Sequence, residues 1–220
     1  MAKTTTTTRT ASRAVAQSPN GTVSRNGRLS PEPHLGQHAP EIQRYGTLRQ
    51  MPIALSAEAR GESAQVLNEI LADTTILYAL YKKHHWLVSG PTFYQLHLLF
   101  DKHAGEQLEL VDELAERVQM LGGIAVGDPR QAAELTTIPR PPDGAEPVPV
   151  MIDRLLEAHE IIIEKVRAGI KATEESEDWG TNDLLMGDVL RRHELQVWFL
   201  SEHVVDVPLV DAVSTVALRS

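Results

Sequence analysis

With 220 residues, of which 42% are hydrophobic, the chain is long and apolar enough for one packed domain with tails. It has no cysteine, which excludes disulfides, thiolate metal sites and cysteine nucleophiles, and its aromatic content of 5% and few alternating β-branched runs disfavour an all-β fold. The net charge of −9 disfavours nonspecific DNA binding by the whole surface, and the lack of a membrane-spanning run or of a signal peptide's apolar core leads us to expect a cytoplasmic protein.

Charge is distributed unevenly along the chain. Residues 1–50 hold seven basic residues against Glu32 and Glu41, which gives this segment a charge of +5 and leaves −14 for residues 51–220. The segment is rich in Thr, Ser, Gly, Pro and Arg and shows no helical apolar period, so we predict a disordered basic N-terminal tail over residues 1–55. Five dispersed basic residues among the first thirty form a weak version of a DNA-binding arm, and a simply solvated tail is an equal alternative.

Apolar residues at helical spacing predict a bundle over residues 56–206, followed by a short C-terminal tail over residues 207–220. The first helix is expected from about Ser56, a possible N-cap, to about Val88. After a Gly-Pro break, the second helix is expected from about Thr92, another possible cap, to the glycine pair at 122 and 123. A helix of about thirty residues is long for a globular domain, which favours a bundle.

A proline-rich connection follows the second helix. Residues 124–148 contain five prolines, with room for a short helix near residues 130–134. The third helix is expected over about residues 150–175, and the fourth from residue 181 or 182 to about 205. We therefore predict an all-α four-helix bundle with a long crossover between its second and third helices.

Four side chains of the second helix share one of its faces. At about 100° per residue, His97, Asp101, Asp112 and Glu116 fall within about 100° of one another. They cannot all bind one ion, because Asp101 and Asp112 are separated by roughly 16 Å along the helix. A second copy running antiparallel across a two-fold axis would set His97 and Asp101 of one chain opposite Asp112 and Glu116 of the other, twice per dimer. The spacing therefore predicts a metal site shared between subunits.

Imidazole and carboxylate ligands suit iron, manganese and zinc better than copper(I). His85 joins the candidate ligands, because the turn between the first two helices brings it towards the His97 end of the site. A less specific interpretation stays open for each residue, since single histidines are often surface or core residues. Asp112 and Glu116 can form a solvated acidic face or pair with Arg117 or Lys102.

A longer motif runs through the same stretch. It consists of His85-Trp86, Val88, Gly90-Pro91, Phe93, His97, Phe100-Asp101, Asp112, Ala115-Glu116-Arg117 and Gly122-Gly123. This pattern resembles the Dps family (DNA-binding protein from starved cells), the mini-ferritin branch of the ferritin-like proteins. The resemblance covers about residues 58–205 and implies a ferritin-like four-helix bundle. Leu87 departs from the family's usual Asn, outside the ligand set.

The resemblance implies a ferroxidase that oxidises Fe(II), preferentially with hydrogen peroxide, and stores ferric mineral in a hollow shell of twelve subunits. Such a protein protects DNA from oxidative damage in the cytoplasm, where association with the nucleoid is also open. The implied metal ligands are His85, His97 and Asp101 from one subunit and Asp112 and Glu116 from its mate. Trp86 would lie beside the site, either to quench stray oxidising equivalents or as a packed interface aromatic.

Two other functions remain open: a nucleoid-binding protein that compacts DNA through its basic tail, and a zinc-occupied shell that buffers metal. His84 could join or replace a ligand or favour zinc, whereas His103 is expected to be structural or at the surface. The absence of a Glu-x-x-His sequence disfavours a di-iron centre within one subunit.

An acidic cluster near the start of the last helix is a candidate for the iron-entry pore that the resemblance implies. A solvated acidic surface is the alternative. The cluster comprises Glu174, Glu175, Glu177, Asp178, Asp183 and Asp188.

Overall fold

The computed structural model describes residues 36, 37 and 39–205. Most of the predicted basic tail and all of the C-terminal tail lie outside these residues, and the domain boundaries at residues 55 and 206 stay a prediction. Throughout the described residues the regular structure is helical, without strands. None of these helices combines the length and the apolar character needed to cross a membrane.

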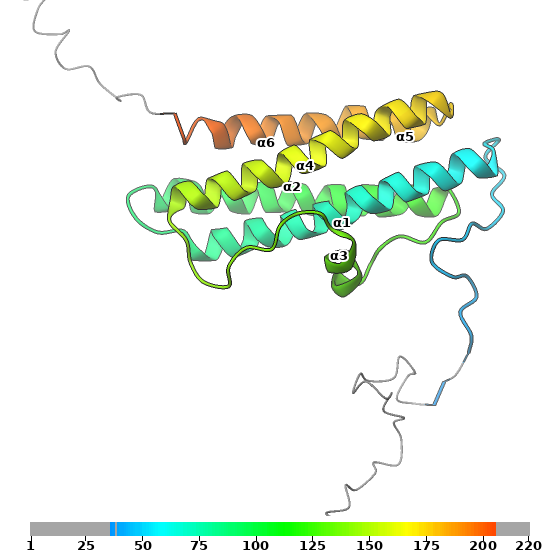
Figure 1. The fold of residues 1–220 in the computed structure, drawn as a ribbon, viewed down its shortest axis with the longest axis horizontal. Helices are drawn as coiled ribbons and strands as arrows, with labels where there is room; N and C mark the ends of the chain where they lie inside the picture. The colour runs from blue at the N-terminus through cyan, green and yellow to red at the C-terminus, as the bar shows by residue number, and fades with distance from the viewer. Residues whose placement is uncertain (1–35, 38, 206–220) are drawn as a thin grey trace, which may run out of the picture. The chain divides into compact units, whose positions relative to one another are not determined.

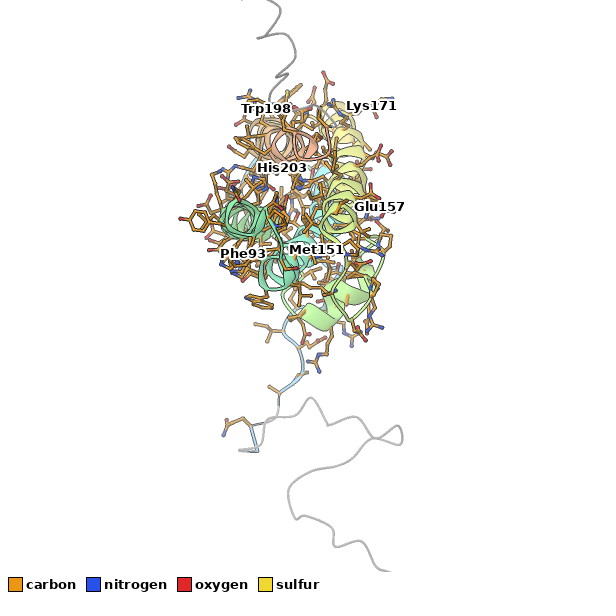
Figure 2. The ribbon with its side chains drawn as sticks, turned by 90° about the vertical axis from the view of Figure 1, so that its left-hand side faces the viewer. Phe93, Met151, Glu157, Lys171, Trp198 and His203 are labelled. Carbon is orange, nitrogen blue, oxygen red and sulfur yellow. The ribbon has the colours of Figure 1, made fainter. Side chains whose placement is uncertain are left out.

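Four long helical rods pack side by side (Figure 1). Their segments are α1 (Ala57–Leu87), α2 (Phe93–Met120), α4 (Val148–Glu175) and a last rod made of α5 (Trp179–Asp183), η1 (Leu184–Leu190) and α6 (Arg191–Ser201). The short α3 (Pro129–Leu135) lies in the crossover between α2 and α4. Figure 2 looks along the rods, with Phe93 of α2 on one flank and Glu157 of α4 on the opposite flank. The predicted ferritin-like four-helix bundle with a long crossover is confirmed.

Local sequence explains where α1 and α2 begin and end. The hydroxyl of Ser56 accepts a hydrogen bond of 3.1 Å from the backbone N–H three residues later, as expected for an N-cap. Thr92 precedes α2 as predicted, but its side chain makes no capping bond. Gly122 ends α2 with φ +86°, and a Cβ there would lie 2.6 Å from the carbonyl oxygen of Arg49. Both its backbone conformation and this close approach require glycine.

Part of the predicted tail contacts the bundle. The Arg49 N–H donates to the carbonyl of Gly122 at 2.9 Å, and the Gln43 side chain donates to the same carbonyl at 2.8 Å. The guanidinium of Arg60 donates to the Arg49 carbonyl at 2.9 Å. These bonds hold the segment that precedes α1 against the end of α2.

A buried carboxylate ties the crossover to the bundle. Asp73 of α1 is fully buried and accepts hydrogen bonds from Lys165 of α4 at 2.5 Å, the Thr136 hydroxyl at 2.6 Å and the Thr137 backbone N–H at 2.9 Å. A buried charge is tolerated when it is paired and fully hydrogen-bonded, as it is here. One side chain thus fixes α1, α4 and the segment after α3.

The last rod contains a π-helical segment, η1, which the sequence analysis did not predict. Along α5, η1 and α6 together, the buried residues Thr181, Leu185, Val189 and His193 recur every four positions. In a regular α-helix, three successive steps of four would turn these side chains about 120° away from the core. The wider i→i+5 turn of η1 offsets this drift, so that His193 still points inward.

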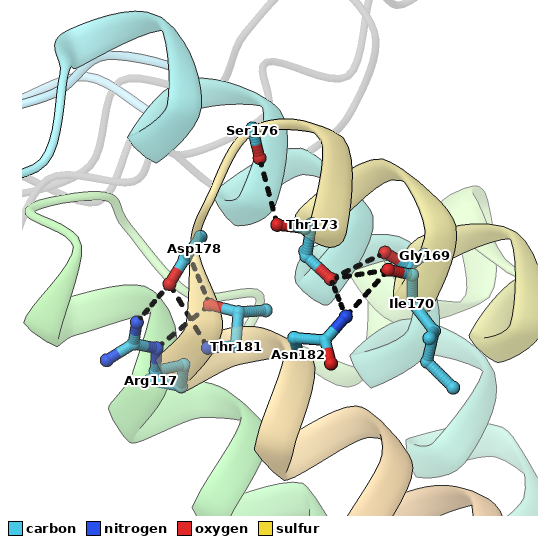
Figure 3. A network of polar contacts seen from close by, with 8 residues as sticks. All are labelled: Arg117, Gly169, Ile170, Thr173, Ser176, Asp178, Thr181 and Asn182. Atoms are coloured by element: carbon cyan, nitrogen blue, oxygen red, sulfur yellow. Dashed lines mark hydrogen bonds and ion pairs between the residues drawn. The ribbon is translucent and has the colours of Figure 1, made fainter.

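The start of the last rod is held by Asp178 (Figure 3). Its carboxylate accepts from the Thr181 backbone N–H at 3.1 Å and from the guanidinium of Arg117 in α2 at 2.6 Å. Asp178 is only 2% exposed. The inclusion of Asp178 among the acidic pore candidates is therefore wrong, because its carboxylate caps α5 and pairs with Arg117.

Candidate metal centre

His85 at the end of α1 and His97 near the start of α2 form a reciprocal pair. Each Nδ1 bonds the backbone carbonyl of the other residue, at 2.7 Å from His85 and 2.9 Å from His97. The rings stack with centroids 3.8 Å apart. Because a carbonyl only accepts, each Nδ1 must carry the proton, which leaves the Nε2 lone pairs available. Such bonds to the second ring nitrogen are the usual way in which proteins orient metal-binding histidines.

Asp101 lies one helical turn after His97. Its Oδ1 is 3.9 Å from Nε2 of His85 and accepts a hydrogen bond of 2.6 Å from Nζ of Lys82. This bond holds the pKa of the Asp101 carboxyl below its usual range, so the group is a carboxylate at neutral pH. The Asp101 carboxylate thus lies near Nε2 of His85, and the Lys82 ammonium competes for it.

Asp112 and Glu116 are exposed on α2, away from this group. Asp101 and Asp112 belong to one continuous helix, so their separation stays at roughly 16 Å. The alternative that the two acids pair with Arg117 or Lys102 is wrong, because Arg117 binds Asp178 and Lys102 binds Glu106. In the part of the chain that the structure describes, no group of three or more His, Asp or Glu side chains of one chain could hold a metal ion.

Exposed apolar side chains accompany these acids on the same face of α2. Tyr94 is 68% exposed, Leu98 49% and Leu108 51%. At 100° per residue all three fall within the same sector of about 100° that holds His97 and Glu116. Among the described residues nothing covers this apolar stripe, which is interleaved with the candidate ligands.

The structure distinguishes the remaining candidates. Trp86 is 70% exposed on α1, with Nζ of Lys82 at 5.9 Å from its ring. His84 is buried, with its ring 6.5 Å from that of Phe100, and burial lowers its pKa to about 4. Because it is buried, its ring does not lie at the surface with His85 and Asp101, as a ligand of that site would. His103 is structural and not at the surface, since it is buried and bonds the hydroxyl of Tyr81 at 3.1 Å.

Sequence reasoning missed Lys82 as a neighbour of the site. The spacing contains a signal for it, because Lys82 and His85 are three residues apart and so share a helix face. Sequence reasoning also missed the buried hydrogen-bond network that joins Tyr81, His159 and His193, because these residues are far apart in the sequence and lie on three helices.

Comparisons with known proteins agree with this architecture. The family model for a ferritin-like domain matches residues 64–210. The structure of DpsC from Streptomyces coelicolor is 62% identical with a TM-score of 0.77, covering 78% of this chain and 99% of that chain. Dps from Thermosynechococcus elongatus is 33% identical with a TM-score of 0.66, covering 71% of this chain and 98% of that chain. A nutrient stress-induced DNA-binding protein of Synechococcus is 31% identical over 70% of this chain and 87% of its own length. The chain therefore belongs to the Dps family of ferritin-like proteins.

Proposed function

We propose that this protein is a ferroxidase, which oxidises Fe(II) with hydrogen peroxide at sites shared between two subunits and stores the ferric product in a hollow shell of twelve. One observation carries the proposal. A single face of α2 holds His97, Asp101, Asp112 and Glu116 together with an exposed apolar stripe. Pairing two such faces antiparallel would cover the stripe and complete two sites at once.

Each site would draw on both chains. His85 and His97 supply Nε2 atoms and Asp101 a carboxylate, which is the 2-His-1-carboxylate set that suits Fe(II) and leaves positions open. Asp112 and Glu116 of the mate add two carboxylates, whose charge favours Fe(III) as product. Two Fe(II) ions then reduce one peroxide to two hydroxide ions, so that peroxide is consumed without releasing a hydroxyl radical.

Trp86 has a secondary role in this proposal. Its exposed ring lies on α1 next to His85, where it could give an electron to an oxidant that escapes the main reaction. Burial of Trp86 as an interface aromatic in the dimer is compatible with the same position.

The test is the ratio of peroxide consumed to Fe(II) oxidised by the full assembly under anaerobic conditions. We expect two Fe(II) ions per peroxide, and loss of this reaction in a His97→Ala, Asp101→Ala, Glu116→Ala variant. Glu109→Ala is the matched control, because Glu109 is an exposed acid of α2 that pairs with Arg192 at 3.0 Å. Normal peroxide-dependent oxidation of Fe(II) by the triple variant would contradict the proposal.

Two further functions have support. The Synechococcus relative is named a DNA-binding protein, and the basic residues 1–35 could give this chain the same property, so DNA compaction is a second candidate. The same nitrogen and carboxylate donors also suit zinc. Metal analysis of the purified assembly separates an iron-handling shell from a zinc-occupied one.

A further inference from the structure

A hydrogen-bond network of buried polar side chains crosses the interior of the bundle. It joins Tyr81 of α1, His103 of α2, His159 of α4 and His193 of α6, and each of these is at most 1% exposed. The Tyr81 hydroxyl is 2.6 Å from Nε2 of His159 and 3.1 Å from Nδ1 of His103. Nδ1 of His159 is 2.8 Å from Nδ1 of His193. All four rods thus contribute one member.

The distances indicate which group donates in each bond. Hydrogen bonds from hydroxyl groups are typically shorter than those from N–H groups. The bond of 2.6 Å therefore has the Tyr81 hydroxyl as donor to His159, and the bond of 3.1 Å has His103 Nδ1–H as donor to the phenol oxygen. Nδ1–H of His159 then donates to His193. His193 must carry its own proton on Nε2, which has no hydrogen-bond partner in the described residues.

This arrangement prepares Tyr81 to lose a proton only together with an electron. Burial, with a smaller effect of Glu106, raises the pKa of the Tyr81 phenol well above 10, which excludes a resting phenolate. Burial also lowers the pKa of His159 well below 6.5, so its imidazole is neutral and Nε2 is free to accept. The neighbouring His193 then accepts a bond from the second nitrogen of the imidazolium formed.

Tyr81 also lies close to the candidate metal centre. It precedes His85 by four residues, which is one turn or about 6 Å of rise along α1. Its ring centroid is 6.2 Å from that of Phe100, the residue before Asp101. A phenol with a built-in proton acceptor is therefore shielded from solvent about one helical turn along α1 from a ligand of the proposed site.

We propose that Tyr81 is an internal one-electron donor that completes peroxide reduction when only one Fe(II) occupies the site, with His159 as acceptor of its phenolic proton. This role rests on the proposed ferroxidase function. One Fe(II) and Tyr81 each give one electron to H2O2, which yields Fe(III), two hydroxide ions, the neutral Tyr81 radical and protonated His159. A later Fe(II) returns one electron to the radical while His159 returns the proton, and Tyr81 and His159 are restored.

The experiment uses freeze-quenched electron paramagnetic resonance on the full assembly, loaded anaerobically with one Fe(II) per site and mixed with equimolar peroxide. We expect a neutral tyrosyl radical that narrows when the tyrosines are ring-deuterated. It should also show a proton coupling that exchanges in D2O, from the His159 N–H directed at the phenol oxygen. Tyr81→Phe should abolish the signal and raise the yield of spin-trapped hydroxyl radical severalfold at this loading. At two Fe(II) per site, its iron oxidation should match that of the unmodified protein.

The chain has four tyrosines, which permits a complementary variant. Replacing Tyr45, Tyr78 and Tyr94 by Phe leaves Tyr81 as the sole tyrosine, and the signal should persist even if Tyr81→Phe proves unable to fold. Normal iron oxidation by peroxide without a Tyr81 radical overturns this role alone. Absence of any peroxide-dependent iron oxidation overturns both this role and the proposed function.

Discussion

Lys82 should act as a competitor for metal at the candidate site. Its ammonium binds Oδ1 of Asp101 at 2.6 Å, and this bond must break before Asp101 can ligate an ion. The side chains of Lys82 and Asp101 are 24% and 53% exposed, and exposed ion pairs contribute about 0.2–1 kcal/mol. Lys82→Gln should therefore raise metal affinity by about 1.4-fold to 5-fold, since 1.4 kcal/mol corresponds to tenfold. Loss of repulsion between the ammonium and a dication acts in the same direction.

Calorimetric titration of the metal-free assembly with Zn(II), which undergoes no redox reaction, measures this change. Lys171→Gln is the matched control, because Lys171 pairs with Glu175 near the end of α4 and its loss should leave the affinity unchanged. An affinity that is unaltered or lower in Lys82→Gln, or an equal gain in Lys171→Gln, would refute the competition.

Three other perturbations have defined outcomes. Burial lowers the pKa of His193 to about 3 and that of His159 well below 6.5, so the unfolded chain binds more protons and stability should fall as pH decreases from about 6.5. In urea unfolding at successive pH values, His193→Gln should reduce this slope by about 1.4 kcal/mol per pH unit; an unchanged slope contradicts the buried neutral state. Asp73→Ala should cost about 3 kcal/mol in thermal unfolding, because it leaves Lys165 without its buried partner, and a loss below 1 kcal/mol contradicts that account. Deletion of residues 1–35 should abolish any DNA binding. In the full chain, a plot of log affinity against log salt concentration should have a slope no steeper than about −4.5, as expected for five phosphate contacts. DNA binding that survives the deletion would show that the tail is not the DNA-binding element.

Most of the fold could be predicted from local sequence signals. Ser56 marks the start of α1 and Gly122 the end of α2, because an N-cap and a positive φ each favour a few residue types at a single position. The common face of His97, Asp101, Asp112 and Glu116 likewise follows from spacing alone, since α2 is one continuous helix. Their role as ligands stays a proposal.

Features that depend on contacts between helices could not be predicted. The bond between Lys82 and Asp101 spans 19 residues and depends on how α1 and α2 pack. The pairing of His159 with His193 likewise requires the approach of α4 and α6, together with the π-helical turn of η1. Asp178 was misassigned because six neighbouring acids look alike in sequence, whereas only this one is buried against Arg117.

Complementation between two inactive variants tests the shared site most directly. One variant carries His97→Ala and Asp101→Ala, and the other carries Asp112→Ala and Glu116→Ala. Random pairing of co-expressed chains gives mixed dimers with one intact and one doubly altered site, so about a quarter of the wild-type number of sites should oxidise Fe(II) with peroxide. Each variant alone should be inactive. Recovery near a quarter is the result that a two-subunit site predicts. Activity that stays at the level of the single variants would contradict it.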